Sequence, residues 1–463
     1  MMYLDYIPIV LPSILIVFSS ITVLYLDNGT KKGYSSAVSL SLAVLVVSFL
    51  VLIVFYALGY YNYSLFAGTL YISNFGYFIS ISALLATIIT IYGGITHLET
   101  SKTRSSFLSL AMLTDLGVIY LSFSYNVITI LASWGVASAA TYVIALIRKD
   151  YSSTIAGVKY LVMGLLSSSL MVLGFAFYIL GVGSLSLDAS IQYQALIILG
   201  IIILSVAFLF KIGAFPFQAW LPDVYSMSDR VSVAFVSSVG KIVGIAPLLD
   251  VIYFLRPTGE LALTIFVVFA IITIMSLIFG NIVAFSRQDF ASMLSYSSIT
   301  QVGFMLIAIT MLPYNSSVAV SGLMVYLLAY SIAQAGLFIA LSHIEKVSGT
   351  SYIEGFRGMS SSDKVLAFSV TVLLLSLLGI PPILGFWAKL FVLEASFSQP
   401  WLTVIGFLNS AVSAGYYIPP IREIFREGEF KMINSTERDA TIIASVLSIA
   451  LGIVAPLIVG VIV

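Results

Sequence analysis

The chain has no cysteine, only two histidines and few charged residues. Asp, Glu, Lys and Arg make up 9% of its 463 residues, against 60% hydrophobic residues. Without cysteine there is no thiolate to hold an iron–sulfur cluster, and His97 and His343 are too few for a metal site. The formal net charge is zero and there is no basic arm, so nucleic acid is not an expected partner. We therefore expect no metal, no cofactor and no electron carrier in this chain.

Hydrophobic stretches long enough to cross a bilayer follow one another along the whole chain. A spanning helix needs roughly 20 apolar residues, and about fourteen segments meet this criterion. They are 7–26, 37–58, 74–95, 106–124, 126–147, 158–181, 193–228 (interrupted), 231–254, 260–281, 290–311, 317–343, 364–397 (interrupted), 401–421 and 440–462. The sequence thus predicts an all-α polytopic membrane protein, a single membrane domain over 1–463 that is surrounded by the lipid bilayer.

The basic residues predict how these segments are oriented. Of the 20 Lys and Arg, 15 fall in every second loop, one (Arg256) falls in the alternate loops, and four lie inside hydrophobic segments. Basic residues favour cytoplasmic loops, so we expect both termini on the extracytoplasmic side of the cell membrane. The first segment has no basic region before it and no small-residue cleavage site, so we expect it to be retained as a helix.

The four lysines inside apolar segments are Lys159, Lys211, Lys241 and Lys389. A charged side chain at bilayer depth costs about 2.5–3.5 kcal/mol on insertion scales and commonly marks an ion or proton path. A lysine held between desolvation and a neighbouring carboxylate can take up and release a proton. We expect this role for Lys211, Lys241 and Lys389. Lys159 is nearer a segment end, where a lysine that extends to the interface is the alternative.

Two segments contain a proline break close to a lysine. Pro216 follows Lys211, and Pro381 and Pro382 precede Lys389. Proline interrupts a helix, and carbonyls freed at membrane depth need protein or water around them. The breaks lie five segments apart, and a unit with an odd number of helices that is repeated in tandem must be inverted. Paired interrupted helices in inverted halves indicate a transport site.

This repeat predicts the organisation of the chain. We expect three helices in 1–100, a first five-helix repeat in 106–254, an inverted second repeat in 260–425 and a last helix in 440–463. The interrupted helices would be the seventh and the twelfth.

Acidic residues at membrane depth are scarce. Asp115 is the one carboxylate near the middle of a segment, whereas Asp250 and Glu394 lie toward outer ends. For Asp115 a role in transport competes with a structural hydrogen bond, and Glu394 is either an exit residue or an interfacial charge. The polar run 294–304 either lines a hydrated path or serves close helix packing.

Six stretches carry a resemblance to a known family. They are VKYLVMGLLSSS, FKIGAFPFQAWLPDVY, FVSSVGKIVGIAPLL, RQDFASMLSYSSITQVGFMLIA, LLSLLGIPPILGFWAKLFVL and LNSAVSAGYYIPPI. Together they resemble the antiporter-like membrane subunits of complex I, the proton-pumping NADH:quinone oxidoreductase, and in particular the subunit N type. Subunits of Mrp-type cation/proton antiporters are related. The resemblance spans the predicted fourth to thirteenth helices.

The resemblance implies a channel of two half-paths joined by a central row of charged residues. Matched residue by residue, Lys211 corresponds to the lysine of the broken seventh helix, Lys241 to the central lysine of the eighth, Lys389 to that of the broken twelfth, and Lys159 to that of the sixth. The resemblance also implies other membrane subunits as partners, with the quinone and the redox centres in those partners.

One departure from the family pattern concerns the fifth helix. The family has a glutamate there that pairs with the lysine of the seventh helix, but this chain has Gly135 at the aligned position and no carboxylate on that segment. Our hypothesis is that Asp115, at similar depth on the neighbouring segment, replaces it. Some relatives carry a lysine on the eleventh helix, where this chain has Gln334.

These observations lead to three candidate functions. The first is a proton-translocating subunit of a complex I-type quinone oxidoreductase, which contributes to that enzyme without redox chemistry of its own. The second is a subunit of a multi-subunit cation/proton antiporter. The third is a membrane spacer that no longer pumps because the fifth-helix glutamate is missing; the cost of four buried lysines argues against it.

Overall fold

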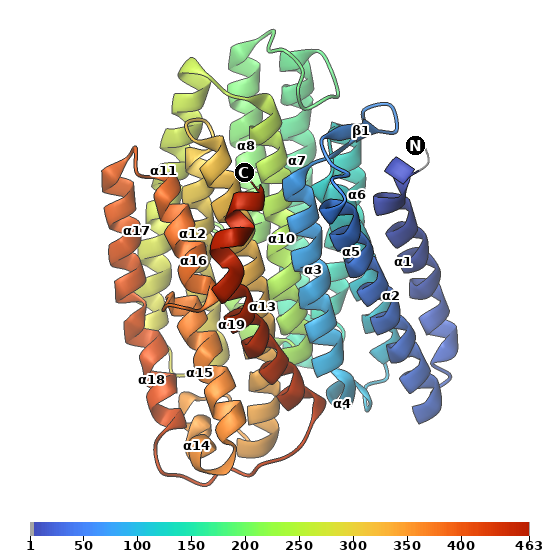
Figure 1. The fold of residues 1–463 in the computed structure, drawn as a ribbon, viewed down its shortest axis with the longest axis vertical. Helices are drawn as coiled ribbons and strands as arrows, with labels where there is room; N and C mark the ends of the chain where they lie inside the picture. Colours follow the sequence, from blue (N-terminus) through green and yellow to red (C-terminus); the bar gives the residue numbers. More distant parts are fainter. Residues whose placement is uncertain (1–3, 463) are drawn as a thin grey trace.

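The computed structural model describes residues 4–462, and these are mostly α-helical (Figure 1). The helices are α1 (Ile7–Leu26), α2 (Lys31–Ala57), α3 (Asn74–Gly93), α4 (Ile95–Leu98), α5 (Arg104–Ser122), α6 (Val127–Ala145), α7 (Tyr151–Val182), α8 (Gln194–Ile212), α9 (Leu221–Met227), α10 (Arg230–Leu255), α11 (Gly259–Phe285), α12 (Phe290–Met311), α13 (Ser316–Ser348), α14 (Met359–Ser362), α15 (Lys364–Leu378), α16 (Leu384–Ala395), α17 (Pro400–Val412), α18 (Ala414–Ile424) and α19 (Thr436–Ile462). Two 3₁₀ turns, η1 (Leu4–Tyr6) and η2 (Ile353–Phe356), and a short antiparallel hairpin of β1 (Tyr63–Leu65) and β2 (Leu70–Ile72) complete the described part.

Twelve helices in the described part of the chain are long and apolar enough to cross a membrane. Each corresponds to one of the segments predicted from the sequence. The two remaining predicted segments, 364–397 and 401–421, each fold as two shorter helices, α15–α16 and α17–α18.

Several helices are longer than their apolar segments. α2 begins at Lys31 rather than 37, and α7 begins at Tyr151 rather than 158. The reason is local capping, because a side chain that accepts from a free backbone N–H stabilises a polar first turn. Thr30 accepts from the backbone of Gly33 at 3.0 Å, and Asp150 accepts from that of Ser153 at 2.7 Å.

Both predicted helix interruptions are present. Gly213 follows the last residue of α8 and Gly379 follows that of α15, and each glycine has a left-handed conformation, with φ of 68° and 90°. A glycine in this conformation is a common way to end a helix, because it has no Cβ to clash. The chain then passes through a short proline-containing segment before the next helix begins at Leu221 or Leu384, and the Phe215–Pro216 and Pro381–Pro382 peptides are cis.

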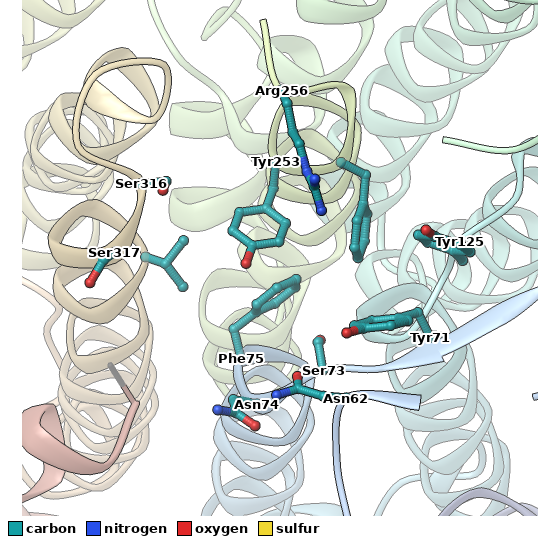
Figure 2. A pocket seen from close by; sticks show the side chains of 12 residues that line it. Asn62, Tyr71, Ser73, Asn74, Phe75, Tyr125, Tyr253, Arg256, Ser316 and Ser317 are labelled. Atoms are coloured by element: carbon teal, nitrogen blue, oxygen red, sulfur yellow. The ribbon is translucent and has the colours of Figure 1, made fainter. Parts of the chain in front are cut away.

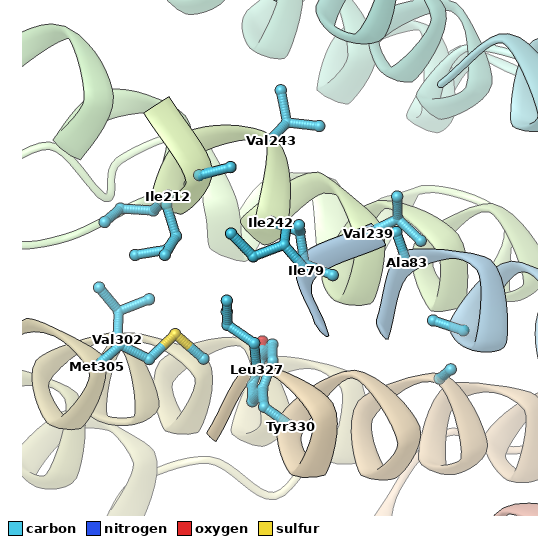
Figure 3. Packing of buried hydrophobic residues seen from close by; sticks show 14 of the residues in the cluster. Ile79, Ala83, Ile212, Val239, Ile242, Val243, Val302, Met305, Leu327 and Tyr330 are labelled. Carbon is cyan, nitrogen blue, oxygen red and sulfur yellow. The ribbon is translucent and has the colours of Figure 1, made fainter. Parts of the chain in front are cut away.

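α10 and α13 form the centre of the bundle. The apolar stretch of each helix is completely buried, and the two helices pack against each other and against α3. Figure 3 shows this packing, with Ala83 of α3, Val239 of α10 and Leu327 of α13 among its members. The exposed hydrophobic residues lie mainly on peripheral helices such as α1, α2, α7 and α11, which is the pattern of surfaces that face lipid.

The first turn of α10 is held by a buried carboxylate. Asp229 accepts a hydrogen bond from the backbone of Ser232 at 3.1 Å, and its other oxygen lies 2.5 Å from Nε2 of His97. Burial raises the pKa of Asp229, but the hydrogen bond and charge of His97, together with the Ser232 N–H, outweigh it and hold the pKa below its usual value. Asp229 therefore stays charged and fixes the end of the helix that carries Lys241.

Candidate functional site

Lys211 lies near the end of α8, where buried aromatic and hydroxyl side chains surround it. Its side chain is 2% exposed, and its ammonium donates to Thr141 Oγ1 at 2.9 Å and to the Tyr160 hydroxyl at 3.1 Å. The same nitrogen lies 4.3 Å from the centre of the Tyr142 ring. Aromatic faces attract cations, so α6 and α7 surround this lysine with neutral groups that accept its charge.

Trp220 connects the side chains around Lys211 to the helix break. The Tyr160 and Trp220 rings stack with centroids 4.2 Å apart, and the Trp220 indole donates to the carbonyl of Phe210 at 2.8 Å. Trp220 immediately precedes α9, so it returns across the break and satisfies a carbonyl of α8. The proline break therefore helps to position the residues around Lys211.

Lys241 contacts the same break from α10. Its side chain is 1% exposed and its ammonium donates to the carbonyl of Ile212, the last residue of α8. The last carbonyls of a helix have no intrahelical partner and carry partial negative charge. A lysine at this point satisfies one of them, and it connects the central helix to the first interruption.

Lys389 contacts the last carbonyl of the helix at the second break, as Lys241 does at the first. It is 5% exposed and donates to the carbonyl of Leu378, the last residue of α15, at 2.9 Å and to Ser410 Oγ at 3.0 Å. Its nitrogen lies 4.6 Å from the centre of the Phe304 ring. Both helix breaks thus present a free carbonyl to a buried lysine.

A chain of hydrogen bonds leads away from the second break. Gln301 of α12 donates to the carbonyl of Leu377 and to the Tyr417 hydroxyl, both at 2.9 Å, and its amide oxygen accepts from Tyr326. Tyr417 also contacts Ser297. The polar run predicted in 294–304 supplies Ser297 and Gln301 to this network, next to a cavity of about 10 Å³ beside Lys389.

Lys159 differs from the other three lysines. Its side chain is 39% exposed and forms an ion pair with Asp223 of α9, which is 41% exposed. Lys211, Lys241 and Lys389 have no ion pair within the described residues. The four lysines that the sequence groups together are therefore three buried cations with neutral partners and one half-exposed ion pair.

The sequence-predicted acidic and polar residues occupy different environments. Asp115 is fully buried on α5; one oxygen accepts from Thr87 at 2.9 Å, and the other has no partner in the described structure. Gln334 is fully buried on α13, with both amide atoms unpartnered there. Glu394 is exposed. Gly135 lies on an exposed face of α6, and a Cβ placed there would meet no atom within 4 Å.

Sequence reasoning did not identify the neutral partners of the lysines. Thr141, Tyr142 and Tyr160 surround Lys211, and Tyr326 and Tyr417 bond to Gln301 near Lys389. Tyr160 and Tyr417 lie inside the stretches that carry the family resemblance, so a signal for them was present. Chemically, a buried lysine with only hydroxyl and carbonyl partners can release its proton without leaving a carboxylate unpaired.

Comparison with known proteins defines the class to which this fold and these sites belong. Residues 124–413 match the family described as NADH:quinone oxidoreductase/Mrp antiporter, TM. The chain belongs to this family of antiporter-like membrane subunits and is a multi-pass membrane protein.

Relatives of the subunit N type confirm the resemblance expected from the sequence. The chain is 30% identical over 394 residues to NADH-quinone oxidoreductase subunit N 2 of Aquifex aeolicus, covering 82% of this chain and 80% of that protein. It is 29% identical over 387 residues to F(420)H(2) dehydrogenase subunit N of Methanosarcina mazei, covering 79% and 76%.

Solved structures show the same architecture. A chain of respiratory complex I from Thermus thermophilus with bound aureothin matches with a TM-score of 0.82 and 26% identity, over 97% of this chain and 98% of that chain. A chain of the Mrp complex from Dietzia sp. DQ12-45-1b matches with a TM-score of 0.84 and 17% identity, over 98% and 96%. At that identity the second match shows a shared fold alone.

Proposed function

We propose that this protein is a proton-translocating, subunit N-like membrane component of a complex I-type quinone oxidoreductase. The observation that carries the proposal is the placement of Lys211, Lys241 and Lys389. Each is buried at or beside a helix break, and each has neutral partners only. Buried lysines in membrane helices are costly and mark ion or proton paths.

The proposed topology has fourteen spans. Twelve spans are the long helices, and the other two are formed by the helix pairs α15–α16 and α17–α18. The first repeat comprises residues 106–254 and the inverted second repeat 260–425, with 1–100 and 440–463 flanking them. Equivalent contacts support this division, because α5 packs on α6 as α11 packs on α12, and α7 packs on both parts of the first interrupted helix, α8 and α9, as α13 packs on both parts of the second, α15 and α16.

The proposed orientation places both termini on the extracytoplasmic side of the cell membrane. α1 and α19 run in opposite directions, so α1 begins and α19 ends toward the same side of the bundle (Figure 1). The basic loops then lie in the cytoplasm, as the distribution of charge predicts. We call the end of the bundle where α3 begins and α10 ends the outer end.

In the proposed path, two half-channels meet at the centre of the bundle. Lys211 at the Pro216 break lies in the first half-channel, and Lys389 at the Pro381–Pro382 break lies in the second. Lys241 on α10 lies between the two half-channels and contacts the end of α8. Gln334 continues the polar axis on α13. Lys159 and Glu394 are assigned supporting roles at the edges of the path, since both are partly or largely exposed.

Asp115 is proposed as the carboxylate that compensates for Gly135. It lies at the middle of α5, which packs on α6, the helix that supplies Thr141 to Lys211. Its hydrogen bond goes to Thr87 on α3, so any effect on Lys211 must act through the field of its charge or through water, rather than through an ion pair.

The redox chemistry is assigned to partner subunits, together with the quinone. The partners are other membrane subunits of the same assembly. The alternative, a subunit of a multi-subunit cation/proton antiporter, shares the fold and the family, and it predicts antiporter subunits rather than quinone-oxidoreductase subunits in the purified complex.

The test is to purify the native complex, identify its subunits, and measure proton translocation with Lys241→Ala and Lys211→Ala. The proposal predicts oxidoreductase partners and a lower number of protons moved per electron in both variants. An unchanged ratio in both variants would overturn the proposal, and antiporter partners without redox subunits would favour the alternative.

A further inference from the structure

A pocket at the outer end of the bundle has no part in the path described above. It has a volume of about 290 Å³ and lies where α3 begins, α10 ends and α13 begins. Its lining is largely polar, with Ser73, Asn74, Tyr253, Arg256 and Ser317 among its members (Figure 2). Arg256 and Ser317 are exposed, so the pocket opens to the surface.

Aromatic rings form the inner boundary of this pocket. The Phe75 ring lies 5.0 Å from that of Tyr253 and 6.2 Å from that of Phe254. In Figure 2 the side chain of Arg256 extends toward the Tyr253 and Phe75 rings.

Asp250 lies about one helical turn before Tyr253 and Phe254 on α10. Residues three and four positions apart share a helix face, so Asp250 is on the same face of α10 as Tyr253 and Phe254, about one turn further into the membrane. Its side chain is 1% exposed, and neither carboxylate oxygen has a hydrogen-bond partner within the described residues. An unpaired buried carboxylate is costly, so Asp250 must carry a proton or be reached by water.

Polar groups continue from this level toward the centre of the membrane. Ser73 is the N-cap of α3, and Ser80 and Thr87 lie seven residues, or about two turns, apart on one face of that helix. Ser73 lines the pocket, Ser80 Oγ lies 2.6 Å from Ser122 Oγ, and Thr87 donates to Asp115 at 2.9 Å. Asp115 and Ser122 have the same spacing on α5.

We propose that the pocket is the outer mouth of a proton route in the first half of the protein, and that Asp250 is the group that exchanges its proton with water entering there. The column of Ser80–Ser122 and Thr87–Asp115 contacts marks the inner course of this route. These two contacts are about 10 Å apart along the helices, so water must bridge the distance between them during turnover. The inference rests on the proposed proton translocation and adds an outlet beside α3 and α10, distant in sequence from Glu394.

The chemical step at Asp250 moves a proton only. A water oxygen takes the proton as the O–H bond of the carboxyl group breaks, which leaves a carboxylate and a hydronium ion. The carboxylate is then protonated again from the inner side. The titratable groups of the pocket are Arg256 and the hydroxyls of Tyr71, Tyr125 and Tyr253.

Because the chain has no cysteine, water access can be measured one residue at a time. Ser317→Cys, Asp250→Cys and Val243→Cys are introduced singly into the complex in sealed vesicles, and a small membrane-impermeant methanethiosulfonate is added from the outer side. Mass measurement of this subunit reports labelling. Val243 is the matched control, because it lies two turns deeper on the same face of α10.

We expect labelling of Ser317→Cys and Asp250→Cys but not of Val243→Cys, and faster labelling of Asp250→Cys when Phe75→Ala is added. Labelling of Ser317→Cys without Asp250→Cys would overturn the proposal, because the pocket would not reach Asp250. Labelling of Val243→Cys as fast as Asp250→Cys would overturn the assignment of Asp250 as the end of the water-filled mouth.

Proton movement is tested separately with Asp250→Asn. We expect it to lose protons translocated per electron, Asp250→Glu to restore them, and Glu260→Gln, an exposed outer carboxylate, to leave the ratio unchanged. A native ratio in Asp250→Asn while Lys241→Ala loses translocation would overturn this route and leave the proposed function intact. Native ratios in Asp250→Asn, Lys241→Ala and Lys211→Ala would overturn the proposed function and the proton role of Asp250 together, whereas the labelling result would stand as a measure of access.

Discussion

At the first helix break the free carbonyl of Ile212 is contacted by Lys241, while Lys211 lies separately among Thr141 and two tyrosines. At the second break the carbonyl of Leu378 accepts from both Lys389 and the Ser410 hydroxyl. The first break thus uses two lysines from two helices, and the second uses one lysine and the amide of Gln301. The two interrupted helices therefore share one arrangement, a lysine that contacts the break, with different side chains around it.

The difference also concerns negative charge. Neither break has a carboxylate paired with its lysine within the described residues, but the family pattern expects one at the first break only. Gly135 leaves that position empty and exposed, while Asp115 is buried against α3. In the proposed path the acid of the first half is therefore Asp115, buried on α5, rather than a residue on the exposed face of α6.

The largest expected effect comes from packing at the second break. A Cβ on Gly385 would lie 1.8 Å from the carbonyl oxygen of Ser376, and backbone cannot move aside as a side chain can. We expect Gly385→Ala to cost about 3 kcal/mol, measured as a lower unfolding temperature or loss of folded protein in detergent.

The control for this prediction is the first break. Gly213→Ala meets a side-chain atom, Leu221 Cδ1, at 2.5 Å, and it places a Cβ at a φ of 68°. The left-handed conformation costs about 1–2 kcal/mol. A Gly385→Ala variant as stable as Gly213→Ala would show that the second break is not the more rigid of the two.

Restoring the family glutamate is expected to have the next largest effect. Gly135→Glu adds a carboxylate on an exposed face of α6, at an insertion cost of about 2.5–3.5 kcal/mol if lipid covers that face. We expect lower membrane insertion than for Gly135→Gln and no gain in protons per electron. Equal insertion together with increased translocation would show that position 135 still belongs to the path.

A smaller effect is expected from removing the side-chain acceptors of the lysines. Thr141→Val combined with Tyr160→Phe removes both hydroxyl acceptors of Lys211, at about 1–3 kcal/mol for the unsatisfied buried donor. Ser410→Ala leaves Lys389 its backbone carbonyl, so about 0.5–1.5 kcal/mol is expected. Chemical unfolding in detergent measures both, and a larger loss for Ser410→Ala would reverse the comparison.

The smallest effect is expected at the ion pair outside the two breaks. Lys159 and Asp223 are each about 40% exposed, and exposed ion pairs contribute roughly 0–1 kcal/mol. A double-mutant cycle with Lys159→Ala and Asp223→Ala should give a coupling energy within that range. Coupling well above 1 kcal/mol would place Lys159 with the three buried lysines.

The sequence predicts the large features because they depend on local chemistry. Pro216 and Pro381 lie within the observed interruptions, and the twelve long helices follow their apolar runs. Helix ends are predicted less well, because caps such as Asp150 extend α7 into polar residues.

The contacts that define the sites depend on tertiary packing and are not predictable from single residues. The stacking of Tyr160 on Trp220 joins residues 60 positions apart, and the bond from Gln301 to Tyr417 joins residues 116 apart. Burial of Lys211 was predicted from its apolar segment, but its neutral partners were not. The same limit applies to Asp115, whose partner Thr87 lies on a helix before the predicted repeat.

Both helix breaks are proposed to belong to one proton path. The most direct measurement is the number of protons translocated per electron by the purified, reconstituted complex with Lys211→Ala or Lys389→Ala, compared with the native complex at equal redox turnover. The account predicts that each variant lowers the ratio. A native ratio in either variant would contradict a single path through both breaks.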